Sequence, residues 1–101
     1  MNKLPTIRQG ETLFDKGRYF ECHELLEEIW MKSEGKKKVL LKGLIQAAAG
    51  FHKLKQGSPE GAAKLFTRAA EKLEKNTVRD AVLLRFKKKV LRKIVPSLSR
   101  F

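Results

Sequence analysis

The sequence is poor in the residues that mark secreted, membrane-spanning and β-sheet proteins. Its 101 residues include one cysteine, Cys22, which excludes an internal disulfide and a cysteine-rich zinc knuckle and is compatible with a reducing compartment. No run of about 18 apolar residues could span a bilayer, and the N-terminus, MNKLPTIRQG, lacks the apolar stretch of a signal peptide. We therefore expect a cytoplasmic protein.

Acidic residues are also scarce, and unevenly so. The chain has 23 Lys and Arg against 11 Asp and Glu, a formal net charge of +12. Residues 1–50 hold 9 basic and 7 acidic residues, whereas residues 51–101 hold 14 and 4, so the positive charge lies in the second half. Such a field attracts nucleic acid, anionic membrane or acidic proteins. The alternative is a solvated lysine-rich surface of the kind found in heat-adapted proteins.

Strand signals are almost absent, and helix signals recur along the whole chain. The pattern predicts an all-α protein: one domain over residues 1–101, folded as a compact bundle of about five helices from two helix-turn-helix hairpins and a C-terminal helix. The expected helices cover residues 7–16, 18–31, 39–56, 59–75 and about 78–95. A chain of this length leaves no room for a separate catalytic domain.

Polar and turn residues set the expected helix ends. Thr6, with Gln9 three residues later, resembles a capping box. The segment KSEGKKK contains a glycine and few apolar residues, so it is predicted to be a loop before the third helix. Asp80 falls in the first turn of the fifth helix, and Pro96 is predicted to end that helix.

A weak internal repeat has an offset of 40 residues. Gly17 precedes Cys22 by five residues, and Gly57 precedes Ala62 by the same spacing. Matching apolar pairs follow in each copy (Leu25 and Leu26; Leu65 and Phe66). The first copy looks like the junction of tetratricopeptide hairpins, where a small side chain lets two helices approach closely. Two copies are too few for a repeat array, so we expect a closed bundle.

The stretch YFECHELLEEIW places polar residues on a core helix. At 100° per residue one arc is apolar (Tyr19, Cys22, Leu25, Leu26, Ile29 and Trp30), and three glutamates lie nearly opposite, where they should face water (Glu21, Glu24 and Glu28). His23 and Glu27, one turn apart, lie at the edge of the apolar arc and are expected to be shielded from solvent. On the third helix Gln46, flanked by Gly43 and Gly50, could hydrogen-bond to this pair.

The chain resembles a bacterial and archaeal family, domain of unknown function 309, over about residues 10–75. The similar segments are GRYFECHELLEEIW and LLKGLIQAAAGFHKLKQGSPEGAAKLF. Ten positions match the family pattern (His23, Glu24, Glu27, Trp30, Gly43, Gln46, His52, Gly57, Gly61 and Ala62). Cys22 departs from it, since the family usually has alanine there. The resemblance implies a small helical fold and no particular activity, and the basic helix after Thr77 lies outside it.

A metal or catalytic site is one interpretation of the polar residues. His23 and Glu27 have the i, i+4 spacing of two ligands on one helix, with His52 or Glu24 as completing groups. H-E-x-x-E replaces the second histidine of the zinc-protease motif with glutamate, and a metal site needs about three convergent ligands. The structural interpretation, which we favour, is a hydrogen-bonded network of His23, Glu27 and Gln46 that sets helix register. A divalent metal is therefore an alternative, and no cofactor is assigned.

Two non-catalytic classes remain. An interaction module is favoured because the chain lacks a nucleophile constellation and a Gly-rich phosphate loop, and Cys22 lies on the apolar arc. Its partner would be another protein or a second copy. The other class is weak, sequence-independent polyanion binding through the last helix, where four cations form a stripe (Arg85, Lys88, Lys89 and Arg92). We favour the interaction module. The candidate polar network or ligand site consists of His23, Glu24, Glu27, Trp30, Gln46 and His52.

Overall fold

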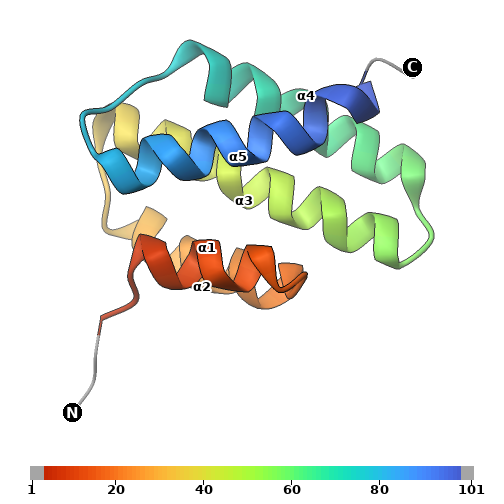
Figure 1. Ribbon diagram of the computed structural model, residues 1–101, viewed down its shortest axis with the longest axis horizontal. Coiled ribbons are helices and arrows are strands. Elements are labelled where there is room, and N and C mark those ends of the chain that lie inside the picture. Colours follow the sequence, from red (N-terminus) through yellow and green to blue (C-terminus); the bar gives the residue numbers. More distant parts are fainter. Residues whose placement is uncertain (1–3, 99–101) are drawn as a thin grey trace.

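Residues 4–98 are described by a computed structural model, with side chains over residues 4–96. They form five α helices and no strand, which confirms the predicted fold class (Figure 1). The helices are α1 (Ile7–Asp15), α2 (Tyr19–Met31), α3 (Gly35–Lys55), α4 (Pro59–Lys75) and α5 (Ala81–Leu98). None of the helices in this part of the chain is both long and apolar enough to cross a membrane.

The repeat is present in the backbone. Gly17 and Gly57 have φ angles of 75° and 81°, the left-handed region in which glycine lacks the Cβ strain of other residues. Each glycine N–H donates to a carbonyl three residues earlier, and the next N–H to one five residues earlier (Gly17 to Phe14 and Arg18 to Leu13; Gly57 to Leu54 and Ser58 to Lys53). Cys22 and Ala62 are fully buried five residues after these turns. The α1–α2 and α3–α4 hairpins are therefore two copies of one unit.

The close contact between the two helices of a hairpin also repeats at an offset of 40 residues. An alanine Cβ built at Gly10 would lie 2.7 Å from Cδ2 of Leu26, and one built at Gly50 would lie 2.5 Å from Cε1 of Phe66. Both partners are buried on the second helix of their hairpin, 40 residues apart. A glycine on the first helix thus admits a large apolar side chain from the second.

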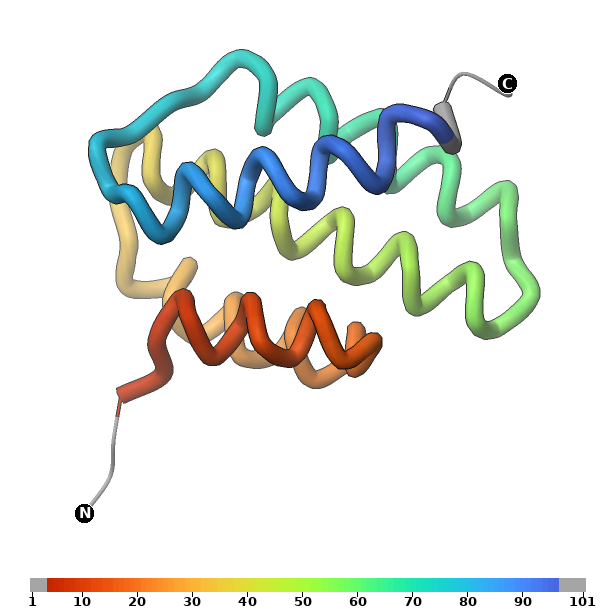
Figure 2. Tube along the Cα trace, in the orientation of Figure 1, coloured from red at the N-terminus to blue at the C-terminus, as the bar shows by residue number. Residues whose placement is uncertain are grey.

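Helix α3 lies at the centre of the bundle, between α2 and α4 (Figure 2). It begins at Gly35, so the prediction of a loop through Lys38 is wrong for its last four residues. Lysine has good helix propensity, so residues 36–38 can be helical without apolar neighbours. The start of α3 does not contact the core, since its first buried residue is Leu40. Gly43 and Gly50 face side chains of α4, so the close approach they permit is to α4.

Helix α5 closes the bundle and buries four apolar side chains completely (Leu83, Phe86, Val90 and Ile94). Asp80 lies just before the helix, where its carboxylate accepts the Leu83 N–H at 3.0 Å, so it acts as a cap and does not sit in the first turn as predicted. The helix also continues through Pro96 to Leu98, contrary to the predicted stop. A proline lacks one intrahelical N–H donor, and here only two helical residues follow it, so little of the helix depends on the lost bond.

Candidate functional site along α2

Helix α2 has one face in the core and one in solvent, as predicted. Cys22 and Leu26 are fully buried, and Glu21, Glu24 and Glu28 are exposed. Burial raises the pKa of the Cys22 thiol to about 12, with a smaller contribution from the charge of Asp15. The thiol is therefore protonated and covered at neutral pH, which excludes it as a nucleophile.

His23 and Glu27 form the expected pair on the edge of α2. The His23 Nε2 lies 3.5 Å from the Glu27 Oε2, and the side chains are 31% and 43% exposed, so the prediction that they are shielded from solvent is wrong. Ala49 of α3 and His23 line the same hollow, so the imidazole borders open space on that side. An ion pair this exposed contributes at most about 1 kcal/mol.

The register between α2 and α3 is fixed by contacts at both ends. Near the start of α2, the Phe20 ring lies 5.4 Å from the His52 ring, and near its end, Trp30 lies 4.7 Å below the Lys42 Nζ. The helices are therefore antiparallel. Gln46, four residues after Lys42, then lies level with Glu27, three residues before Trp30.

Two facing stripes result, and we call them together the α2–α3 seam. Each stripe follows helical spacing, with Phe20, His23, Glu27 and Trp30 on α2 and Lys42, Gln46, Ala49 and Lys53 on α3. All eight residues are half-buried or exposed. The seam therefore contains four of the predicted site residues (His23, Glu27, Trp30 and Gln46), whereas Glu24 is exposed and lines a separate hollow, which Glu27 also borders.

Two buried polar atoms at the seam have no hydrogen-bond partner within the described residues: Nδ1 of His23 and Oε1 of Gln46. Such atoms each cost about 1–3 kcal/mol when they remain unpaired. The contact of His23 with Glu27 is present, but Oε1 of Gln46 and Nδ1 of His23 have no partner among the described side chains, so the predicted network does not extend through these two atoms.

One end of the seam widens into a hollow of about 250 Å³. It is lined by Phe20, His23, Ala49, His52, Lys53 and Gln56. His52, the remaining predicted site residue, thus shares this hollow with His23, and the Phe20 ring contacts both imidazoles. At the opposite end, Lys38 and Lys42 each hold an ammonium group 4.7 Å from the Trp30 ring centroid, the geometry of a cation–π contact.

The metal interpretation gains no third ligand. In the described part of the chain, no group of three His, Cys, Asp or Glu side chains is placed to hold one metal ion. We therefore expect His23→Ala to change the free energy of unfolding by less than about 1 kcal/mol, since its one ionic partner is exposed. Zinc and manganese should leave the melting temperature of the wild type unchanged. A metal-dependent rise that His23→Ala abolishes would establish a metal site; urea and thermal unfolding measure both quantities.

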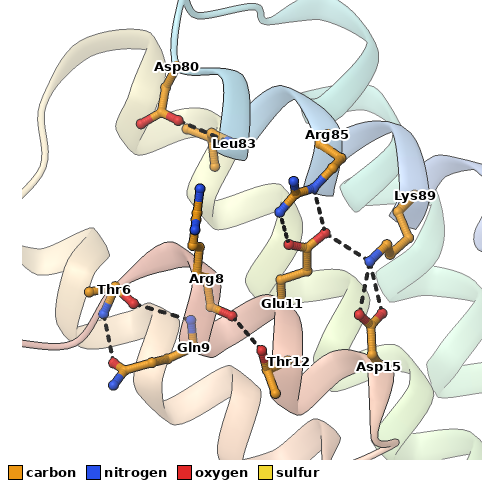
Figure 3. A network of polar contacts seen from close by, with 10 residues as sticks. All are labelled: Thr6, Arg8, Gln9, Glu11, Thr12, Asp15, Asp80, Leu83, Arg85 and Lys89. Atoms are coloured by element: carbon orange, nitrogen blue, oxygen red, sulfur yellow. Dashed lines mark hydrogen bonds and ion pairs between the residues drawn. The ribbon is translucent and has the colours of Figure 1, made fainter.

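The cationic stripe of α5 is divided between two environments. Arg85 and Lys89 reach across to α1, where they hold the buried Glu11 at 2.7 Å and 2.8 Å (Figure 3). Lys89 also contacts Asp15 at 2.9 Å. The Arg85 and Lys89 hydrogen bonds lower the pKa of Glu11, against an opposing effect of burial. These two cations therefore join α5 to α1.

Lys88 and Arg92, the other half of the stripe, are exposed and have no ion-pair partner among the described side chains. If the wild type binds heparin or duplex DNA, replacing both with glutamine should flatten the dependence of log affinity on log salt by about 0.9 per lost contact. Stability should be unchanged, because neither side chain supports α5. No retention of the wild type on heparin at about 50 mM salt would contradict polyanion binding.

Comparison with known proteins gives a family without an assigned activity. The model of the domain of unknown function DUF309 matches residues 7–65, which include α1, α2, α3 and the first part of α4. An uncharacterised protein of Aquifex aeolicus is 34% identical over 65 residues, which cover 62% of this chain and 19% of the relative. The chain thus spans about a fifth of the length of that relative. No solved structure matches this chain. Since the family model covers more than half of the chain, the protein belongs to the DUF309 family.

Proposed function

We propose that the protein is a non-catalytic binding module, and that the α2–α3 seam binds a segment of another protein. The observation that carries this proposal is the coincidence, on one surface, of two unpartnered buried polar atoms with an exposed aromatic ring. The Phe20 side chain is 51% exposed, although its ring has contacts with both His23 and His52. Exposed aromatic residues beside unsatisfied polar groups are typical of recognition surfaces.

The chemistry of the two polar atoms favours a peptide. In neutral His23, the proton belongs on Nε2, which faces the carboxylate of Glu27, so Nδ1 is a hydrogen-bond acceptor. Oε1 of Gln46 is also an acceptor. Both atoms are covered in this structure, so a ligand reaches them only when side chains at the seam move apart. It must then bring donors, and the backbone N–H groups of a polypeptide are such donors. Phe20 then offers an apolar side chain of the same segment a surface to pack against.

The occurrence of this unit in a longer relative supports a modular role. The similar region makes up 19% of the Aquifex protein, so a closely related sequence there is accompanied by further chain. A unit that recurs beside different additional chain can act as a module, and its function has to be argued from its own surface.

Selection of displayed peptides on the immobilised protein tests the proposal. A synthetic selected peptide should bind wild type in calorimetry and lose about tenfold in affinity with Phe20→Ala, as expected for an aromatic anchor. Leu54→Ala is the matched control, because Leu54 is 41% exposed and lies outside the seam. Amide chemical shifts should change along the seam on binding. The proposal fails if no peptide is selected. It also fails if selected peptides bind Phe20→Ala as tightly as they bind wild type and Leu54→Ala.

A further inference from the structure

A second surface, at the C-terminal end of α2, is more apolar than its surroundings. Met31 and Leu4 are 69% and 71% exposed, and they stand over a hollow of about 720 Å³. Pro5, Ile29, Ser33 and the stems of charged residues complete its lining (Glu28, Lys32 and Lys37). A smaller hollow of about 400 Å³ lies on the other side of Met31 and also includes Glu28. Met31 is therefore an apolar ridge between two hollows.

The charges around Met31 have both signs and are not neutralised within the chain. Glu28 and Lys32 are one turn apart on the same edge, and neither has an ion-pair partner among the residues that the structure describes. Helix α2 carries four of the 11 acidic residues and no lysine or arginine. In a chain of net charge +12, this helix is where a second copy could approach with the least repulsion.

We propose that this surface is a self-association interface, in which two copies pair antiparallel along α2 about a twofold axis. With the axis at the level of residue 30, Glu28 lies opposite Lys32 of the second copy, and Met31 is level with its Ile29, which lines the larger hollow. Each copy therefore places its ridge in the hollow of the other, and both symmetry-related charge pairs have opposite signs. Self-complementarity of this kind is the requirement of a closed dimer.

A second copy fits this surface better than a polyanion or an unrelated basic partner. A polyanion would meet Glu24, Glu27 and Glu28 along the smaller hollow. A uniformly basic helix would pair with these glutamates but would face Lys32 and Lys37 on the larger hollow. A matching partner needs positive charge opposite the glutamates of the smaller hollow and negative charge opposite the lysines of the larger hollow. The antiparallel second copy presents its charges in that order.

Charge reversal tests the pairing by sedimentation equilibrium of the full chain. Wild type should form a dimer, and Glu28→Lys or Lys32→Glu alone should each lower the association constant by about tenfold or more, because each places like charges together twice. An equimolar mixture of the two variants should recover dimers, since the heterodimer pairs opposite charges at both positions. Glu74→Lys and Lys64→Glu are controls with the same change in net charge on the exposed surface of α4.

The outcomes separate this inference from the proposed function. A wild type that is monomeric at every concentration overturns the interface, as does a dimer that resists both reversals or a mixture that stays monomeric. Circular dichroism must first show that the variants retain their helices. Phe20→Ala should leave the dimer intact, so loss of peptide binding at the seam and loss of self-association are independent results.

Discussion

Replacing Gly50 with alanine is expected to lower the free energy of unfolding by about 1–2 kcal/mol and the melting temperature by about 5–10 °C. The new Cβ would lie 2.5 Å from Cε1 and 2.7 Å from Cδ1 of Phe66, a ring that is 1% exposed and has little room to move. Overpacking of a filled core costs about 1–3 kcal/mol, and the higher helix propensity of alanine offsets about 1 kcal/mol. The cost of overpacking should exceed the gain in helix propensity, because the rigid, buried Phe66 ring cannot adopt another rotamer without moving its neighbours.

The repeat supplies a matched control. Gly10→Ala creates a similar contact with Leu26, at 2.7 Å, but chiefly to the end of an aliphatic side chain that can change rotamer, so its destabilisation should be smaller than that of Gly50→Ala. Phe66→Leu combined with Gly50→Ala should recover part of the loss, with a coupling energy of about 1 kcal/mol in a double-mutant cycle. Urea unfolding of wild type, Gly10→Ala, Gly50→Ala, Phe66→Leu and the double variant measures these effects. Equal effects of Gly10→Ala and Gly50→Ala would contradict the role assigned to the ring.

The hairpins could be predicted from the sequence because their determinants are local. A left-handed glycine closes a helix wherever the chain turns, and Gly17 and Gly57 adopt this conformation at the predicted places. The capping box of Thr6 and Gln9 also forms as predicted, with bonds of 2.9 Å and 3.2 Å. Such features depend on residues a few positions apart, which a single sequence displays.

Exposure at the seam could not be predicted in the same way. Helical periodicity gives the direction of His23 on α2, but its exposure depends on which α3 residue lies opposite. That residue, Ala49, follows from a register set by Phe20 with His52 and by Trp30 with Lys42. These contacts join positions far apart in the chain, so the pattern of α2 alone does not contain them.

Glu11 is the residue that sequence reasoning missed, although a signal was present. Together with Ile7, Gly10 and Phe14 it occupies the i, i+3, i+4, i+7 positions that form the inner face of a helix. A carboxylate on an inner face predicts a cationic partner, because an unpaired buried charge is costly. The identity of that partner could not be predicted, since Arg85 is 74 residues away.

Glu11→Gln is expected to destabilise the protein by about 1–2 kcal/mol at neutral pH, by weakening the attachment of α5 to α1. Breaking a fully buried ion pair costs about 3–5 kcal/mol. The smaller value applies because the side chains of Arg85 and Lys89 are 58% and 33% exposed and can be hydrated when the carboxylate charge is lost. Glu21→Gln is the control, since its pair with Arg18 is exposed on both sides and should contribute less than about 0.5 kcal/mol.

The same substitution should remove part of the pH dependence of folding. The pKa of Glu11 is lowered from 4.5 in the folded state, so the unfolded chain takes up the proton first as the pH falls. The stability that Glu11 contributes is therefore fully present above about pH 4.5 and is lost as the pH falls through the lower folded pKa. Urea unfolding at pH 6 and pH 3 should show wild type and Glu11→Gln converging in stability at the acidic value. A difference between them that is the same at both pH values would mean that the Glu11 carboxylate does not hold α5 through its charge.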